Sequence, residues 1–559
     1  MPGPSGSGPD TVLAGVRPKR GSRRLRVFVA GGLAVALLLG GGAAAAFLRM
    51  RGAPEQILGE IPASTDAVVV AYLDPAASQK LNLLRLEGRF PSLASSQHLR
   101  DQVNAGLDAA LRDSGLDHRD VAWVGSEIAI AVDIRPQGDP GVAVLLSVDD
   151  AGAADATLQK LRAEPASDPS SWTRVTHGGV DVWSGTEASG SEVAVAMVEG
   201  VAVLSNSRSM VEGVIDAGQG TVARLQDDAR FRATMSDLPE AKLGFAYLNA
   251  ATLGDLLARS PAFGAAAAGP GLGALSAVTS VAVSVSAQPD GLAIDTTQRY
   301  DRSKLTPEML RVLAQPPHVN PLLTEVPAAA YGVIAQQHVD AALRSFVDTL
   351  GAGSTGVGGP FGEAEIGNLV QVLTGDLAIE AESGGPVTPD AAILLGSSDD
   401  ERMRSEVDRL GAVSASSGAR WRIEAYRGVT IHVLVGEEFL PFVPAYAVVD
   451  HAAVIATSDA EIKRIVDTSK GGPNITSSPV FRATTAGSEA SDAGSEASDA
   501  LAFVDVQRVV AAVRGALPLE QRAWFDWHVA PDLRNVVSFS FRSDDEVTGS
   551  RSRVFVRIR

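Results

Sequence analysis

The sequence predicts an α+β protein, in which a single N-terminal transmembrane helix precedes two homologous halves, each a mainly antiparallel sheet with helices. Three observations predict this fold: an uncharged apolar run at 27–48, an internal repeat, and short β-branched runs between amphipathic stretches. The chain has 559 residues, enough for several domain-sized units. We expect a basic tail over 1–26, a membrane helix over 27–48, a first half over 52–318 and a second over 319–559.

The apolar run carries the predicted membrane helix. It reads VFVAGGLAVALLLGGGAAAAFL, with six basic residues just before it and only Arg49 and Arg51 just after it. A helix of this length is about 33 Å long, which matches the hydrocarbon core of a bilayer. The positive-inside rule keeps the N-terminus in the cytoplasm, so we expect a single-pass cell-membrane protein whose bulk is extracytoplasmic. A signal peptide cleaved after Ala45 is the alternative.

Composition excludes several classes of protein. Cysteine is absent, which excludes a disulfide scaffold, thiolate catalysis and Cys-ligated zinc or iron–sulfur clusters. The formal net charge is −18, and the acidic excess lies entirely beyond the basic N-terminal segment. A chain of this charge repels the phosphate backbone, so we expect no nucleic-acid partner.

The internal repeat is the strongest organisational signal. The tetrapeptide Phe-Arg-Ala-Thr at 231–234 returns unchanged at 481–484, and Trp172 and Gly179 match Trp421 and Gly428. Ordered matches at nearly constant spacing indicate duplication. In each copy, short runs such as EIAIAVDI and GVAVLLSV are typical of strands, and helical stretches such as 151–162 and 401–410 intervene. A tandem heptapeptide over 487–500 is predicted to be a flexible surface insertion.

The sequence contains no recognisable catalytic or metal-binding motif. A Gly-x-Gly-x-x-Gly segment at 351–356 follows a helical segment instead of a strand, which indicates a loop. The acidic pairs at 149–150 and 399–400 precede amphipathic stretches and predict helix caps. The histidines lack metal-ligand spacing, and no Gly-x-Ser-x-Gly elbow is present. We therefore predict a protein that is not an enzyme, with no catalytic residue, cofactor or metal.

One candidate interaction surface is a turn between two predicted strands in the second copy. It carries Phe439, Leu440, Phe442 and Val443 together with two prolines, where the first copy has the polar segment 188–191. Contiguous apolar residues at a turn are typical of a contact site for a lipid or a protein. The alternative is a lid that folds back over its own sheet.

A second candidate surface lies near the C-terminus. Trp524 and Trp527 flank Phe525 in the helix-like segment PLEQRAWFDWH. Tryptophans are common at interfaces because they combine a large apolar ring with a polar N–H group. Packing of these rings in a buried core is the alternative.

The segment that follows the apolar run contains a distinctive series of residues, in order Asp66, Asp74, Pro75, Gln79, Lys80, Phe90 and Pro91. A Gly-x-Glu strand pattern follows at Gly125. With these residues the segment resembles the opening of domain-of-unknown-function family 3352, a family of exported, membrane-anchored bacterial proteins. The resemblance implies location and architecture, but it transfers no activity and no functional residues.

Together these observations predict a non-enzymatic envelope module that binds a lipid, a peptide or another envelope protein. The membrane itself, through the N-terminal helix, is an expected partner. The alternative is an envelope hydrolase or transferase, whose site is assembled from residues distant in sequence. A deep polar pocket with a perturbed acid–base pair is typical of the enzyme, whereas an apolar groove is typical of the binding module.

Overall fold

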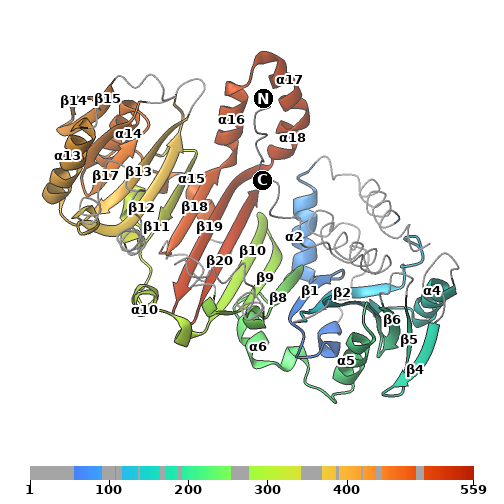
Figure 1. Cartoon of the computed structure of the whole chain (residues 1–559). Coiled ribbons are helices and arrows are strands. Elements are labelled where there is room, and N and C mark those ends of the chain that lie inside the picture. Colours follow the sequence, from blue (N-terminus) through green and yellow to red (C-terminus); the bar gives the residue numbers. More distant parts are fainter. Residues whose placement is uncertain are drawn as a thin grey trace, which may run out of the picture. The chain divides into compact units, whose positions relative to one another are not determined.

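The computed structural model describes residues 56–90, 108, 116–135, 139–163, 172–186, 192–252, 276–340, 368–384, 389–416, 420–435, 443–485 and 497–559. These residues form mainly antiparallel sheet, twenty strands among the described residues, with flanking helices (Figure 1). The chain divides into two compact units. The first unit is Met1–Ala77, Ser96–Arg232 and Leu243–Asn249, and the second is Ser78–Ser95, Ala233–Lys242 and Ala250–Arg559.

The predicted fold class is wrong. Strands at 278–288 and 291–300, which the prediction placed in the first half, pair with each other and with the strand at 549–558, so the sheet divides differently from the two predicted halves. No helix among the described residues has the length and apolar character needed to cross a membrane, and residues 27–48 lie outside the described residues. Periodicity in the sequence locates strands, but it does not show which distant strands share a sheet, because register depends on partners far along the chain.

The first unit contains eight strands in the spatial order β8-β1-β2-β3-β7-β6-β5-β4, and every neighbouring pair is antiparallel. The strands are β1 Ala67–Tyr72, β2 Val124–Asp133, β3 Gly141–Val148, β4 Trp172–His177, β5 Val180–Thr186, β6 Glu192–Val198, β7 Val201–Ser205 and β8 Gly244–Leu248.

The second unit contains twelve strands in the order β9-β10-β20-β19-β18-β11-β12-β13-β17-β16-β15-β14, again with antiparallel neighbours. The strands are β9 Val278–Gln288, β10 Gly291–Tyr300, β11 Gly332–Gln336, β12 Leu373–Glu382, β13 Asp390–Ser397, β14 Arg420–Tyr426, β15 Val429–Val435, β16 Ala445–Val449, β17 Ala452–Ala456, β18 Ala500–Asp505, β19 Val536–Glu546 and β20 Gly549–Ile558.

Helices pack on the sheet and join its strands. The α-helices are α2 Ala77–Glu87, α4 Ala151–Ala163, α5 Arg208–Gly218, α6 Ala229–Met235, α10 Pro307–Leu313, α13 Asp400–Ser416, α14 Asp459–Ser469, α15 Pro479–Thr485, α16 Val506–Ala516, α17 Leu519–His528 and α18 Ala530–Leu533. The 3₁₀-helices are η1 Ile57–Glu60, η3 Leu225–Asp227, η4 Arg302–Lys304, η5 Pro321–Thr324 and η6 Ile475–Ser477.

Each unit has an apolar core between helices and sheet. In the first unit, Leu158 and Leu161 of α4 pack against Ile130 and Val144 of the sheet, and all four are buried. In the second unit, the rings of Phe481 and Phe503 meet edge to face at 5.1 Å in a larger core. The apolar alternation of the strands therefore places the cores where the helices cover the sheet.

Corresponding strands of the two units have corresponding registers. Val69 of β1 pairs with Ile130, as Ile334 of β11 pairs with Ile379. Both β4–β5 and β14–β15 are hairpins with two-residue turns, Gly178-Gly179 and Arg427-Gly428, in which all four residues have positive φ. Positive φ at both central residues gives the turn the right-handed twist of its strands.

The predicted helix caps are confirmed. The alignment of the two copies at these caps, however, is shifted by one residue from the alignment read from the sequence. Asp150 Oδ1 accepts hydrogen bonds from the N–H groups of Gly152 and Ala153, each at 3.0 Å. Asp399 Oδ1 accepts from Arg402 N, also at 3.0 Å. Asp399 is therefore the structural counterpart of Asp150, whereas the sequence match of the pairs 149–150 and 399–400 aligns Asp399 with Asp149.

Candidate interaction surface

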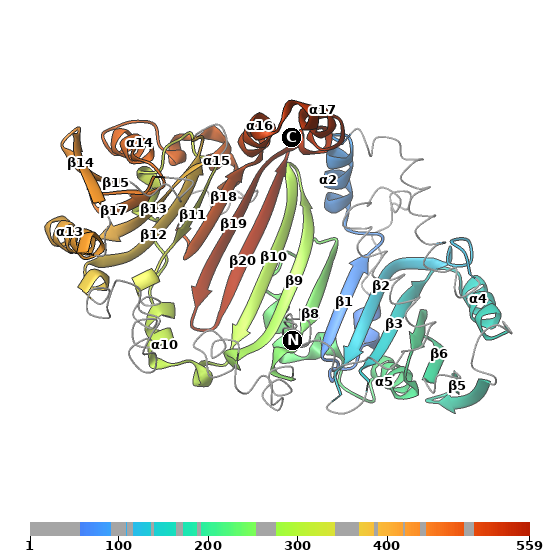
Figure 2. The same ribbon diagram turned by 45° about the horizontal axis from the view of Figure 1, so that its top comes forward.

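A helical hairpin, formed by α16 and α17, is inserted between strands β18 and β19 of the second unit. In both views it lies beyond the ends of these strands (Figure 1 and Figure 2). The Asp505 side chain begins α16 by accepting a hydrogen bond from Arg508 N at 3.1 Å. Pro518, which ends the connection, precedes α17 because proline is tolerated where helical N–H groups have no partner.

Polar contacts hold the two helices together. Arg514 donates from Nε and Nη2 to the two carboxylate oxygens of Asp526 at 2.7 and 2.8 Å, which is a bidentate pair between α16 and α17. This hydrogen bonding lowers the pKa of Asp526 below its ordinary value. Arg522 donates to the carbonyl oxygens of Leu517 and Gly515 at 2.9 and 2.8 Å, which closes the connection.

The base of the hairpin is anchored to the sheet. Gln507 Nε2 donates to the carbonyl oxygens of Leu533 and Val536 at 2.8 and 2.6 Å. Arg508 Nη1 also donates to the carbonyl of Ala330 at 3.1 Å. On α17 itself, Phe525 is buried and contributes the apolar contact. The hairpin is thus a braced extension of the unit.

The predicted aromatic residues lie on the outside of this hairpin. Trp524 is 59% exposed and Trp527 is 80% exposed, so neither ring packs in a core. Leu519, at the start of α17, is 79% exposed. The Trp524 ring stacks on His528 at 5.3 Å, which fixes its orientation. Two tryptophans three positions apart share one face of a helix, so the hairpin presents a contiguous apolar face.

The other predicted surface is only partly described. Val443 is 51% exposed, and its N–H donates to the carbonyl of Thr457 at 3.1 Å. Phe439, Leu440 and Phe442 lie outside the described residues. Their role in binding therefore stays a prediction.

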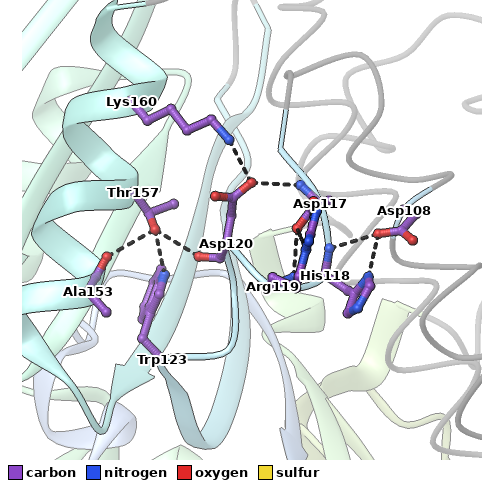
Figure 3. Close-up of polar contacts among 9 residues, drawn as sticks. All are labelled: Asp108, Asp117, His118, Arg119, Asp120, Trp123, Ala153, Thr157 and Lys160. Atoms are coloured by element: carbon purple, nitrogen blue, oxygen red, sulfur yellow. Dashed lines mark hydrogen bonds and ion pairs between the residues drawn. The ribbon is translucent and has the colours of Figure 1, made fainter.

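A cluster that the sequence analysis missed lies beside α4 in the first unit (Figure 3). The oxygen and nitrogen atoms of Asp108, Asp117 and His118 that could bind a metal ion lie within 4.8 Å of one another, a spacing that fits one ion. His118 already directs its N–H and Nδ1 at Asp108 Oδ1, each at 2.8 Å. Arg119 forms a close ion pair with Asp117 and lowers its pKa. These acids therefore have partners within the chain.

The same segment is fastened to α4 by a second set of contacts. Asp120 Oδ2 accepts from Asp117 N at 2.9 Å and from Lys160 Nζ at 2.8 Å. Thr157 Oγ1 donates to the Asp120 carbonyl at 2.7 Å and accepts from Trp123 Nε1 at 3.1 Å. The arrangement orders a loop against the helix (Figure 3). The acidic and basic run Asp117-His118-Arg119-Asp120 was the available signal in the sequence.

Comparison with known proteins places the chain in a family. Residues 29–356 match the model of a family described as protein of unknown function (DUF3352). The chain belongs to this family. The resemblance read from Asp66 to Pro91 is thereby confirmed for this DUF3352 member.

Other comparisons add little to this assignment. No curated protein matches the chain. Crystal form III of TP0453 is 12% identical with a TM-score of 0.23, and the match covers 48% of this chain and 90% of that one. Crystal form IV of TP0453 is 11% identical with a TM-score of 0.24, with 44% and 81% covered. The family assignment therefore rests on the family model alone.

Proposed function

We propose that this DUF3352 member is a non-enzymatic binding module of the cell envelope and that its α16–α17 hairpin docks on a lipid surface. The exposure of Trp524 and Trp527 on a braced hairpin is the observation that carries this proposal. Tryptophan side chains favour the region between headgroups and acyl chains, where the ring is buried and the N–H stays hydrated. Leu519 adds an aliphatic side chain to the same element.

Charge supports a lipid occupant. The chain as a whole has a net charge of −18, yet residues 506–534 carry four arginines against three carboxylates. The hairpin is therefore a place where an acidic protein does not repel an anionic membrane. Apolar contact combined with attraction to anionic headgroups is the usual basis of interfacial binding.

The envelope location rests on the sequence. A basic segment followed by the apolar run at 27–48 is the pattern that directs export. Export brings the hairpin to the same compartment as the outer surface of the membrane. A binding role is favoured over catalysis because the sequence contains no recognisable nucleophile or metal motif.

We predict that changing both tryptophans to serine weakens vesicle binding by about tenfold or more, because two interfacial rings are lost. The measurement is co-sedimentation of the full chain with phosphatidylcholine vesicles, with and without phosphatidylglycerol. The control variant is Ile423→Ser, because Ile423 is 65% exposed on β14, away from the hairpin. Binding by the wild type should increase with phosphatidylglycerol.

Two results would overturn the proposal. The first is a wild-type chain that binds neither vesicle type, which would leave a protein partner as the occupant. The second is equal loss of binding in Ile423→Ser and in the double variant, which would indicate non-specific adhesion of apolar surface.

A further inference from the structure

A pocket of about 270 Å³ opens between α13 and the neighbouring strands β15 and β16 in the second unit. Its wall includes both aromatic and charged side chains. Those used below are Arg404, Asp408, Arg427, His432, Tyr446 and Lys470. This pocket is remote in sequence from the α16–α17 hairpin and has no part in the proposed membrane contact.

The first unit fills the equivalent place with core side chains. The pair His432–Tyr446 between β15 and β16 corresponds in register to Trp183–Val195 between β5 and β6. Trp183 packs against the apolar core of the first unit, and Arg162 of α4 covers its ring at 4.6 Å. In the second unit the indole is replaced by a smaller imidazole and Val195 by the larger Tyr446, so the two units fill this place with different side chains.

The aromatic wall of the pocket is ordered. The rings of His432 and Tyr446 stack at 4.5 Å with an interplanar angle of 8°, and Trp421 meets Tyr446 edge to face at 4.8 Å. A Cβ on Gly411 of α13 would lie 2.1 Å from the Tyr446 hydroxyl, so only glycine accommodates that ring. Burial raises the pKa of Tyr446 to about 12, so its hydroxyl stays protonated and can donate a hydrogen bond.

Cations are the second distinguishing feature of the pocket. Lys470 Nζ lies 2.7 Å from Asp450 and Arg427 Nη1 lies 2.7 Å from Asp467, so both cations are held in place. Arg404 has no ion pair or side-chain hydrogen bond with any described residue. Arg427 and Lys470 are thus each paired with an acid, and the lining itself holds two acids, Asp408 and Asp450.

The first unit has no cation at the corresponding positions. The N-caps Asp150 and Asp399 align α4 with α13, which places Asp155 opposite Arg404. The matching hairpin turns place Gly178 opposite Arg427, and the C-caps of α5 and α14 place Gln219 opposite Lys470. These three cations are therefore particular to the second unit, whereas the first unit has Arg162 over the Trp183 ring at 4.6 Å.

We propose that this pocket binds a small anionic ligand through a phosphate or carboxylate group that contacts Arg404 and Lys470. The guanidinium of Arg404 offers a planar set of donors suited to either group. Lys470 adds a point charge, and the Tyr446 hydroxyl adds a neutral donor. The aromatic wall excludes water from one side of the ligand, which strengthens these hydrogen bonds.

The test is isothermal titration calorimetry on the full chain, with inorganic phosphate and with succinate as separate probes. We expect the wild type to bind at least one of them, and the probe that binds identifies the anionic group. Arg404→Ala should weaken that binding by about tenfold or more, because a charge-assisted hydrogen bond is lost. Arg402→Ala is the matched control, because Arg402 is exposed on the same helix and donates to Gln371 at 2.8 Å.

A second variant keeps the test independent of Arg404. His432→Trp introduces the larger ring of the first unit and should abolish binding, and circular dichroism shows that the variant is folded. The proposal is overturned if neither probe binds the wild type. It is also overturned if Arg404→Ala and Arg402→Ala bind the probe equally.

Discussion

Replacing Arg464 with alanine is expected to destabilise the second unit by about 3 kcal/mol near pH 8, because breaking a buried ion pair leaves carboxylates without their counter-charge. Arg464 lies on α14 and donates from Nε to Glu461 Oε2 at 3.0 Å, and the same nitrogen lies 2.6 Å from Glu382 Oε1. It also forms a close ion pair with Asp390. Glu461 is completely buried, and among the described residues Arg464 is its ion-pair partner.

The loss of stability in Arg464→Ala should be confined to the second unit, so hydrogen exchange with mass spectrometry is the appropriate measurement. Peptides from β12 and α14 should lose protection in Arg464→Ala, whereas peptides from the first unit should not change. Arg551→Ala is the control, because the Arg551–Glu546 pair is exposed on both sides and contributes little. Unchanged exchange in β12 and α14 would contradict the prediction.

A compensating variant tests the electrostatic cause. The N-caps Ser207 and Ser458 align α5 with α14, so Met210 and Gly213 occupy the places of Glu461 and Arg464. The first unit therefore has neither of these two charges on its helix. Adding Glu461→Met to Arg464→Ala should restore much of the lost protection, because it removes the buried carboxylate.

Local patterns in the sequence predicted individual elements well. The predicted helical stretch at 151–162 lies in α4, the run GVAVLLSV is β3, and all but the last residue of EIAIAVDI lies in β2. These local patterns could not predict which strands pair with one another in a sheet. β10 pairs with β20, so Ile294 lies opposite Val554, and no local signal specifies a partner so remote in the chain.

The candidate surface shows the same limit. Trp524, Phe525 and Trp527 form one apolar cluster in the sequence, which is equally typical of a core and of an interface. Only the position of the hairpin beyond the ends of β18 and β19 separates buried Phe525 from the exposed tryptophans. The buried carboxylates of β12 near Arg464 did have a signal in the sequence, because Glu380 and Glu382 alternate along β12 and therefore share one face.

The second large effect concerns pH. Four carboxyl groups are buried and titrate far above their ordinary value. Burial and the neighbouring Glu461 raise the pKa of Glu380, which is 1% exposed. Burial also raises the pKa of Glu382 to about 7, that of Glu325 to about 8 and that of Glu60 to about 7. These groups hold protons in the folded state that the unfolded chain releases near pH 4.5.

The sign of the effect follows from linkage. Because the folded state binds more protons than the unfolded state above pH 4.5, the free energy of unfolding falls as pH rises through the folded pKa values. Surface acids such as Asp459 and Asp467 have lowered pKa values, so their contribution is lost only below the ordinary value of 3.8. Between pH 5 and 8 the raised groups therefore dominate, and we expect the chain to lose stability, with about 3 kcal/mol as the scale for one group whose pKa rises from 4.5 to about 7.

Urea unfolding at a series of pH values measures this loss, and Glu380→Gln identifies its source. Glutamine keeps the size of the side chain but does not ionise, so the variant should be less sensitive to pH between 5 and 8 than the wild type. Glu380 faces Glu461, Glu382 and Arg464, so its removal relieves repulsion among carboxylates that share one arginine. Glu401→Gln, an exposed change in the first turn of α13, should leave the wild-type pH profile unaltered. Stability that rises from pH 5 to 8, or parallel profiles for Glu380→Gln and the wild type, would contradict the assignment of these protons to the buried cluster.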